Sequence, residues 1–168
     1  MAHAVLVGLP GVGKSTVGHA AAQVLGVPFL DLDVVIAQQA GEASAADVMA
    51  ARGVAAFREI EASCLLDVLE ASAIVATGGG VVERFANRQV LRQHARVLWL
   101  DCADEDILPR VAGSDRPLLA GAPAESLAAL RRAREMLYLE IATTRIDATG
   151  NLADVVDSVI AAMSGWAS

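Results

Sequence analysis

The sequence reads Gly8-Leu9-Pro10-Gly11-Val12-Gly13-Lys14-Ser15-Thr16 directly after the apolar run Ala4-Val5-Leu6-Val7. Two glycines separated by four residues and followed by Lys and Ser form the pattern of a phosphate-binding P-loop, which connects a strand to a helix. Glycines let the backbone approach phosphate oxygens, and the amides at the start of the helix favour an anion. The stretch therefore predicts a strand, a nucleotide phosphate site and a helix. A plain glycine-rich turn is the alternative, and the Lys and Ser weigh against it.

Six consecutive residues of this loop are predicted to contact a nucleotide: Gly11, Val12, Gly13, Lys14, Ser15 and Thr16. Lys14 is expected to reach the β- and γ-phosphates as a point charge, and the Ser15 hydroxyl to ligate Mg²⁺. Lys14 is also the only lysine among thirteen basic residues. A compact ammonium in a chain that otherwise uses arginine indicates a position where the planar guanidinium does not fit.

Length, composition and charge limit the class of protein. The 168 residues fit one domain, and no apolar run approaches the roughly 20 residues that cross a bilayer. The net charge of −7 disfavours nucleic acid and anionic membranes as partners, so an anion site must be a local positive cleft. No charged leader with a cleavage site opens the chain, and Cys64 and Cys102 have neither metal-ligand nor disulfide-framework spacing. We therefore expect a cytoplasmic protein with buried thiols. We also expect a monomer, although none of these properties determines the oligomeric state.

Apolar runs that end in turn residues recur at intervals long enough for helices. They cover residues 4–7, 28–32, 73–77, 96–100 and 144–148. Strands that alternate with helices form parallel sheets covered on both faces. The sequence therefore predicts one three-layer α/β domain over residues 1–168, with a central five-stranded parallel sheet.

Two aspartates, Asp31 and Asp33, lie at the end of the second apolar run. If the strand includes both, their side chains project on one side at the carboxyl edge, where open α/β sheets bind ligands. One carboxylate could hold metal-bound water, and the other could orient or deprotonate an acceptor hydroxyl. The alternative is that one of the two aspartates, Asp33 in preference to Asp31, caps a helix beginning at Val34.

The segment 53–70 has helical periodicity, and Arg58 and Glu61 are three residues apart on it, so Glu61 can hold the guanidinium. A solvated surface pair is the usual meaning of this spacing. The expected apolar face of this helix consists of Phe57, Ile60, Cys64 and Val68.

Three glycines, Gly78, Gly79 and Gly80, follow the third apolar run. A tight turn needs one or two glycines, so three at the carboxyl edge of a buried strand indicate close approach of a ligand to bare backbone. A tight turn alone is the alternative.

Residues 112–123 are loop-like and carry one arginine, Arg116, between glycines. Pro117 biases Arg116 toward an extended backbone, and a segment of this composition can act as a lid over phosphoryl transfer. A plain surface loop is the alternative. The helix predicted from 124 to about 142 carries Arg134 and Tyr138 one turn apart, and periodicity alone does not single them out.

Together these motifs resemble the shikimate kinase family along nearly the whole chain. The resemblance rests on residues 8–16, 31–33, 57–61, 78–80 and 116–119, with Arg134 and Tyr138. It implies a small-molecule P-loop kinase related to nucleoside monophosphate kinases, with a substrate-binding subdomain at approximately 33–60 and a lid at 112–123. The implied reaction is transfer of the γ-phosphate of ATP to the 3-hydroxyl of shikimate, a step towards chorismate and the aromatic amino acids.

The resemblance implies a role for each residue on the acceptor side. Asp33 would contact the acceptor hydroxyl. Arg58, Arg134 and the backbone of Gly79 and Gly80 would bind shikimate, with both guanidinium groups on its carboxylate.

On the donor side, the resemblance implies that Arg116 neutralises charge on the transferring phosphoryl group together with Lys14 and Mg²⁺. Asp31 would reach the metal through water. Arg110 and the turn at 147–151 would flank the adenine. Lys14, Asp33 and Arg116 are therefore the predicted catalytic residues.

Two features depart from the family pattern: Val54 stands where members usually have Glu, and residues 44–49 lack the usual Ile-Phe pair. A gluconate-kinase-like enzyme would share the loop and the fold, but it would not explain the paired aspartates, three glycines and two arginines. A non-catalytic nucleotide-binding module is expected to lack Lys14, Ser15 or Arg116, which are all present. A GTPase is disfavoured because the chain has no Asn-Lys-x-Asp motif.

Overall fold

A five-stranded parallel sheet forms the centre of the part of the chain that the computed structural model describes, residues 4–94, 96–111 and 122–164. The strands are β1 (Ala4–Val7), β2 (Phe29–Asp31), β3 (Ile74–Ala76), β4 (Val97–Asp101) and β5 (Thr144–Asp147). Their order is β2-β3-β1-β4-β5, and all neighbours pair in parallel. The predicted sheet is confirmed, with every strand boundary within one residue of the expected run.

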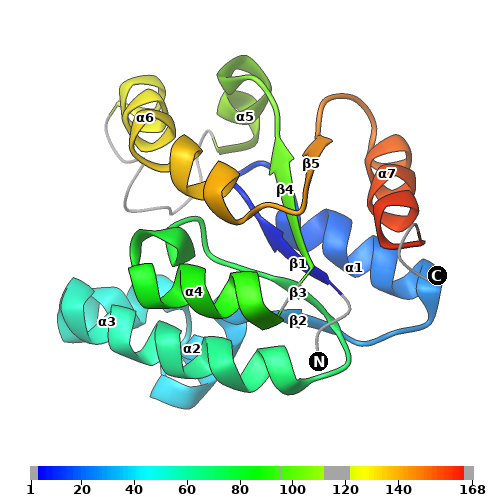
Figure 1. The fold of residues 1–168 in the computed structure, drawn as a ribbon. Helices are drawn as coiled ribbons and strands as arrows, with labels where there is room; N and C mark the ends of the chain where they lie inside the picture. The colour runs from blue at the N-terminus through cyan, green and yellow to red at the C-terminus, as the bar shows by residue number, and fades with distance from the viewer. Residues whose placement is uncertain (1–3, 95, 112–121, 165–168) are drawn as a thin grey trace.

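Helices cover both faces of the sheet, as the three-layer prediction requires (Figure 1). On one face lie α1 (Lys14–Leu25) and α7 (Leu152–Ser164), and on the other α3 (Ala45–Glu70), α4 (Phe85–His94) and α6 (Pro123–Ile141). The remaining helices are α2 (Leu32–Ala40), the 3₁₀ helix η1 (Val81–Glu83) and α5 (Asp104–Val111). Among the described helices, none combines the length and the apolar character needed to cross a membrane.

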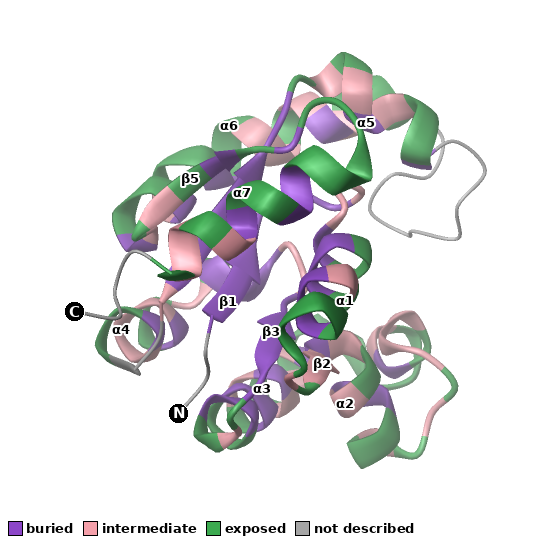
Figure 2. Cartoon of the chain, turned by 90° about the vertical axis from the view of Figure 1, so that its right-hand side faces the viewer, coloured by how far each residue is buried: buried purple, intermediate pink, exposed green. Residues whose placement is uncertain are grey.

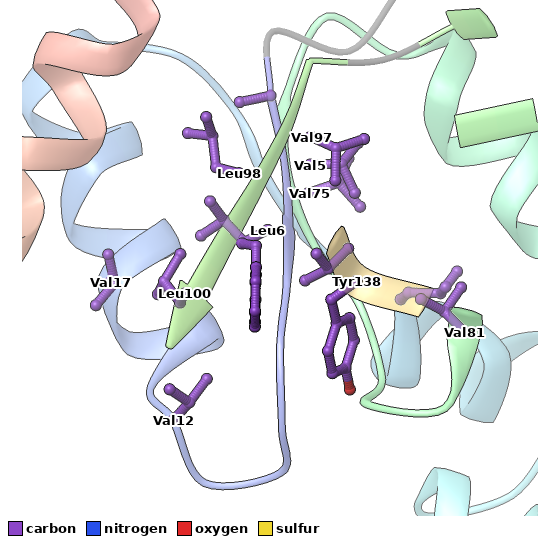
Figure 3. Close-up of a cluster of buried hydrophobic side chains, with 14 of the residues drawn as sticks. Val5, Leu6, Val12, Val17, Val75, Val81, Val97, Leu98, Leu100 and Tyr138 are labelled. Carbon is purple, nitrogen blue, oxygen red and sulfur yellow. The ribbon is translucent and has the colours of Figure 1, made fainter. Parts of the chain in front are cut away.

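The hydrophobic core lies against both faces of the central strands. Strands β1 and β3 are buried throughout, whereas the outer faces of the helices are exposed (Figure 2). Val5 and Val97 point to one side of the sheet, and Leu98 and Leu100 point to the side of α1 (Figure 3). Both cysteines are free and buried as predicted, and burial raises the pKa of each thiol.

Helix α2 begins earlier than the sequence suggested. Asp31 is its N-cap, and the Asp31 side chain accepts a 3.0 Å hydrogen bond from the backbone N–H of Asp33. Asp33 therefore lies in the first turn of α2 rather than on the strand. The prediction that strand alternation puts both aspartate side chains on one side of the sheet is wrong. The cap alternative is wrong for Asp33 and correct for Asp31.

The predicted helix 53–70 is the second part of the longer helix α3. Ser44 caps the start of α3 by accepting a 3.1 Å hydrogen bond from the N–H of Asp47. Gly53 interrupts the helix with φ 81° and ψ 165°, a conformation that glycine adopts readily. This break separates residues 45–52 from the predicted helix 53–70.

Candidate active site

The P-loop borders a cavity of about 320 Å³ at the carboxyl edge of the sheet. Four segments that are far apart in sequence meet there: the loop with the start of α1, the start of α2, the residues after β3, and α5. The lining residues are Gly11, Gly13, Lys14, Ser15, Thr16, Asp33, Thr77, Gly78, Gly79 and Arg110.

The loop has the backbone of an anion site. Gly8 has φ +145°, and a Cβ there would lie 2.3 Å from the carbonyl oxygen of Leu100, so only glycine fits. Gly13 is the N-cap of α1 and supplies no side-chain cap, which leaves the first amides of the helix to a ligand. Lys14 is 7% exposed and donates from Nζ to the carbonyl oxygens of Gly8 and Leu9, each at 2.9 Å. The lysine thus lies within the loop rather than extending into solvent.

Ser15 and Asp31 lie side by side next to this cavity. The Ser15 hydroxyl donates a 2.5 Å hydrogen bond to Oδ2 of Asp31. Mg²⁺ prefers oxygen ligands and usually takes one or two from the protein, with phosphates and water completing its shell. The pair therefore fits Mg²⁺ bound together with nucleotide phosphates. Within the described ranges, no cluster of three or more His, Cys, Asp or Glu side chains forms a metal cage.

The three consecutive glycines each accommodate a different neighbouring group. A Cβ on Gly78 would lie 2.8 Å from Oδ1 of Asp33, and one on Gly80 would lie 2.2 Å from Nη2 of Arg58. A Cβ on Gly79 would lie 2.9 Å from Cδ of Pro10. None of the three has a positive φ, so they are required for close packing rather than for turn geometry. In this structure the groups that lie close to the backbone of the three glycines are side chains of the protein itself.

Arg58 and Glu61 form a buried pair rather than a solvated one. Nη1 of Arg58 donates to both carboxylate oxygens of Glu61, at 3.0 and 2.9 Å, and the Glu61 side chain is 1% exposed. Burial raises the pKa of Glu61 above its ordinary value, and the Arg58 guanidinium opposes that shift. The surface-pair alternative is therefore wrong.

Arg134 meets Arg58 through a residue that the sequence analysis missed, Glu83. Arg134 donates from Nε and Nη2 to Oε1 of Glu83, at 2.9 and 2.6 Å, and Arg58 donates from Nη2 to Oε2 at 2.6 Å. The buried Nη1 of Arg134 has no hydrogen-bond partner among the described residues. The only sequence signal for Glu83 is its position three residues after Gly80, at the end of η1.

Tyr138 fixes the glycine segment from the other side. Its hydroxyl donates a 2.5 Å hydrogen bond to the carbonyl of Gly79, and its ring stacks on Trp99 at a centroid distance of 5.9 Å. Burial raises the pKa of the phenol. Tyr138 and Arg134 thus share the buried face of α6. Helical periodicity alone does not distinguish these two residues from the others on the helix.

The predicted adenine contacts do not line one cavity. Arg110 lines the P-loop cavity and donates from Nη1 to the carbonyl of Val12 at 3.1 Å. Asp147 and Thr149, from the turn after β5, line a second cavity of about 510 Å³ with Arg131. The adenine site stays a prediction, and Arg116 with residues 112–121 lies outside the described part of the chain.

A P-loop between the central strand and the first helix of this parallel sheet, with Ser15 and Asp31 beside it, defines the class: the protein has the fold and phosphate site of a P-loop kinase. Its sequence matches the shikimate kinase family over residues 10–164. The chain belongs to the shikimate kinase family.

Individual relatives agree with this assignment. The chain is 44% identical over 142 residues to a shikimate kinase from Paracidovorax citrulli, which covers 82% of this chain and 77% of the relative. A shikimate kinase from Acinetobacter baumannii, solved in complex with shikimate, superimposes with a TM-score of 0.90 at 32% identity, over 98% of this chain and 94% of that one. A gluconokinase from Sinorhizobium meliloti superimposes with a TM-score of 0.63 at 17% identity, over 98% of this chain and 93% of that one, and shares the fold alone.

Proposed function

We propose that the protein transfers the γ-phosphoryl group of ATP to the 3-hydroxyl of shikimate, giving shikimate 3-phosphate and ADP in aromatic amino acid biosynthesis. The observation that best supports this is the sequence of groups along the cleft. A phosphate site is followed by one carboxylate, Asp33, and then by Arg58 and Arg134 across the glycine segment. Shikimate carries hydroxyl groups and a carboxylate, which suit these two acceptor elements.

On the donor side, the first amides of α1 and the ammonium of Lys14 would bind the β- and γ-phosphates. To do so, Lys14 exchanges its hydrogen bonds to the loop carbonyls for bonds to phosphate oxygens. Ser15, and Asp31 through water, would hold Mg²⁺, which when bound neutralises charge on the phosphates. Arg116 would contribute a further positive charge as the γ-phosphoryl group moves, and Arg110 would contact the nucleotide.

On the acceptor side, Asp33 would accept a hydrogen bond from the substrate hydroxyl and orient its oxygen toward the γ-phosphorus. Gly78 lets Asp33 lie close to the end of β3. Arg58 and Arg134 would bind the substrate carboxylate, and the backbone of Gly79 and Gly80 would line its ring. Positioning and electrostatic stabilisation account for most of the catalysis in this scheme, so Asp33 need not be a strong base.

The acidic composition supports small molecules as the partners. A net charge of −7 disfavours nucleic acid and anionic lipid as ligands, so we expect ATP and shikimate to be the bound species. We also expect a monomer located in the cytoplasm, with residues 33–60 as the substrate-binding subdomain and 112–123 as the lid.

The experiment is to incubate the protein with ATP, Mg²⁺ and shikimate, and to analyse the products by phosphorus NMR. We expect a phosphomonoester resonance coupled to the proton on C3 of the ring, appearing together with ADP. Phosphorylation at another hydroxyl would reject the assigned position, and ADP without a phosphorylated acid would reject the transfer itself.

A further inference from the structure

The carboxylate of Glu83 lies between two guanidinium groups. It accepts from Arg58 through one oxygen and from Arg134 through the other, at donor–acceptor distances of 2.6 to 2.9 Å. Two arginines that share one carboxylate form a geometry well suited to binding an acid. In this structure the acid is part of the protein.

Charge is balanced within this cluster of four side chains. Arg58 and Arg134 supply two positive charges, and Glu61 and Glu83 supply two negative charges. The two carboxylates differ in freedom, because Glu61 is 1% exposed whereas the Glu83 side chain is 40% exposed at the end of a short 3₁₀ helix. Arg134 is 2% exposed and therefore cannot readily move out to meet a ligand. Glu83 is thus the member of the cluster that can leave.

We propose that Glu83 is an internal competitor for the substrate carboxylate and thereby a specificity-determining residue. The inference rests on the proposed function. When an acidic substrate binds Arg58 and Arg134, Glu83 moves into solvent and the number of carboxylates on the two guanidinium groups stays the same.

Selectivity for acids follows from this exchange. If Glu83 stayed in place, the substrate would add a third carboxylate to two guanidinium groups and would be repelled. A neutral analogue cannot replace the negative charge of Glu83 beside the two guanidinium groups, so it does not displace Glu83. Glu83 therefore lowers the affinity for every ligand, but an anion overcomes its effect best.

Glu83→Gln tests the competition because it keeps the shape of the side chain and removes its charge. We expect the KM and the calorimetric Kd for shikimate to fall by about 3- to 10-fold, the effect of no longer breaking a partly exposed ion pair. The KM for ATP and kcat should stay within about 2-fold of the unmodified protein, since Glu83 does not line the P-loop cavity. Glu83→Ala should shift the shikimate KM in the same direction.

Glu140→Gln is the matched control. Glu140 also pairs with an arginine at 2.9 Å, Arg88 of α4, and its side chain is 30% exposed, but it contacts neither Arg58 nor Arg134 and does not line the P-loop cavity. It should leave the shikimate KM unchanged. Thermal melting of each variant shows whether the fold is retained.

A shikimate KM and Kd that stay the same or rise in Glu83→Gln would overturn the inference, because Glu83 would then hold the arginines in place rather than compete for them. That result, in a protein that phosphorylates shikimate, leaves the proposed function intact. Absence of shikimate-dependent ADP release in the unmodified protein would instead reject the proposed function, and this inference with it.

Discussion

Arg58 donates from Nη1 to both carboxylate oxygens of Glu61, one helical turn further along α3. Glu61 has almost no exposed surface, so the pair directs the rest of the guanidinium toward Glu83 and the backbone of Gly80. A buried acid therefore sets the position of the arginine that we assign to the substrate carboxylate.

Burial of Glu61 predicts a pH dependence of stability. Its pKa is raised in the folded state, so the folded protein retains this proton to higher pH than the unfolded chain. The free energy of unfolding of the unmodified protein should therefore decrease, relative to Glu61→Gln, as pH rises from near the ordinary pKa of 4.5 through the raised value. Urea denaturation at intervals from pH 4.5 to 7 measures this difference in the free energy of unfolding. A difference that grows in favour of the unmodified protein as pH rises would contradict the raised pKa of Glu61.

Replacing Arg58 should weaken substrate binding more than turnover. For Arg58→Ala we expect the shikimate KM to rise by about 10- to 100-fold, the loss of charge-assisted hydrogen bonds to a carboxylate. The KM for ATP should change little. Steady-state kinetics measure both, with Arg92→Ala as the control because Arg92 is exposed and 3.9 Å from Glu140. An unchanged shikimate titration would remove Arg58 from the binding site.

Replacing Gly80 should affect substrate binding far more than it affects the stability of the fold. A Cβ at Gly80 would overlap the end of the flexible Arg58 side chain, which can shift, so Gly80→Ala should raise the shikimate KM about 10-fold or more at small cost in stability. Gly26→Ala is the converse control. Gly26 has φ +66° and open space around it, so the substitution should lower the free energy of unfolding by about 1 kcal/mol without changing the kinetics. Melting curves and KM values together test both; normal kinetics in Gly80→Ala would mean that Arg58 need not hold its position.

Lys14 is predicted to stabilise the transferring phosphoryl group. Lys14→Ala should lower kcat by about 100-fold or more, as loss of one transition-state charge contact typically does. Lys14→Arg should also be impaired, because the planar guanidinium does not reproduce the two carbonyl contacts of a buried ammonium. Single-turnover kinetics with saturating ATP measure the step, and near-normal turnover in Lys14→Ala would refute the role.

Much of the fold could be predicted from the sequence because its signals are local. Each strand is a short apolar run ending in turn residues, and the P-loop glycines fix the connection from β1 to α1. The start of α2 was misplaced because Asp31 and Asp33 fit a strand end and a helix cap equally well, and only the hydrogen bond from the Asp33 amide to Asp31 decides between them.

The acceptor side could be predicted only in part. Arg58 and Arg134 were named from family resemblance, but the residue between them was not, because Glu83 acquires its role through contacts with α3 and α6 that have no sequence period. The glycines were recognised as sites of close approach, whereas the approaching groups, Asp33 and the Arg58 guanidinium, depend on tertiary packing.

The most direct test of the central claim is the initial rate of ADP release with Mg²⁺ and saturating ATP, measured in parallel with shikimate, with gluconate and with no acceptor. We predict a rate with shikimate far above both other reactions, and a rate with gluconate equal to that without acceptor. A rate with shikimate no higher than the no-acceptor reaction would contradict the account.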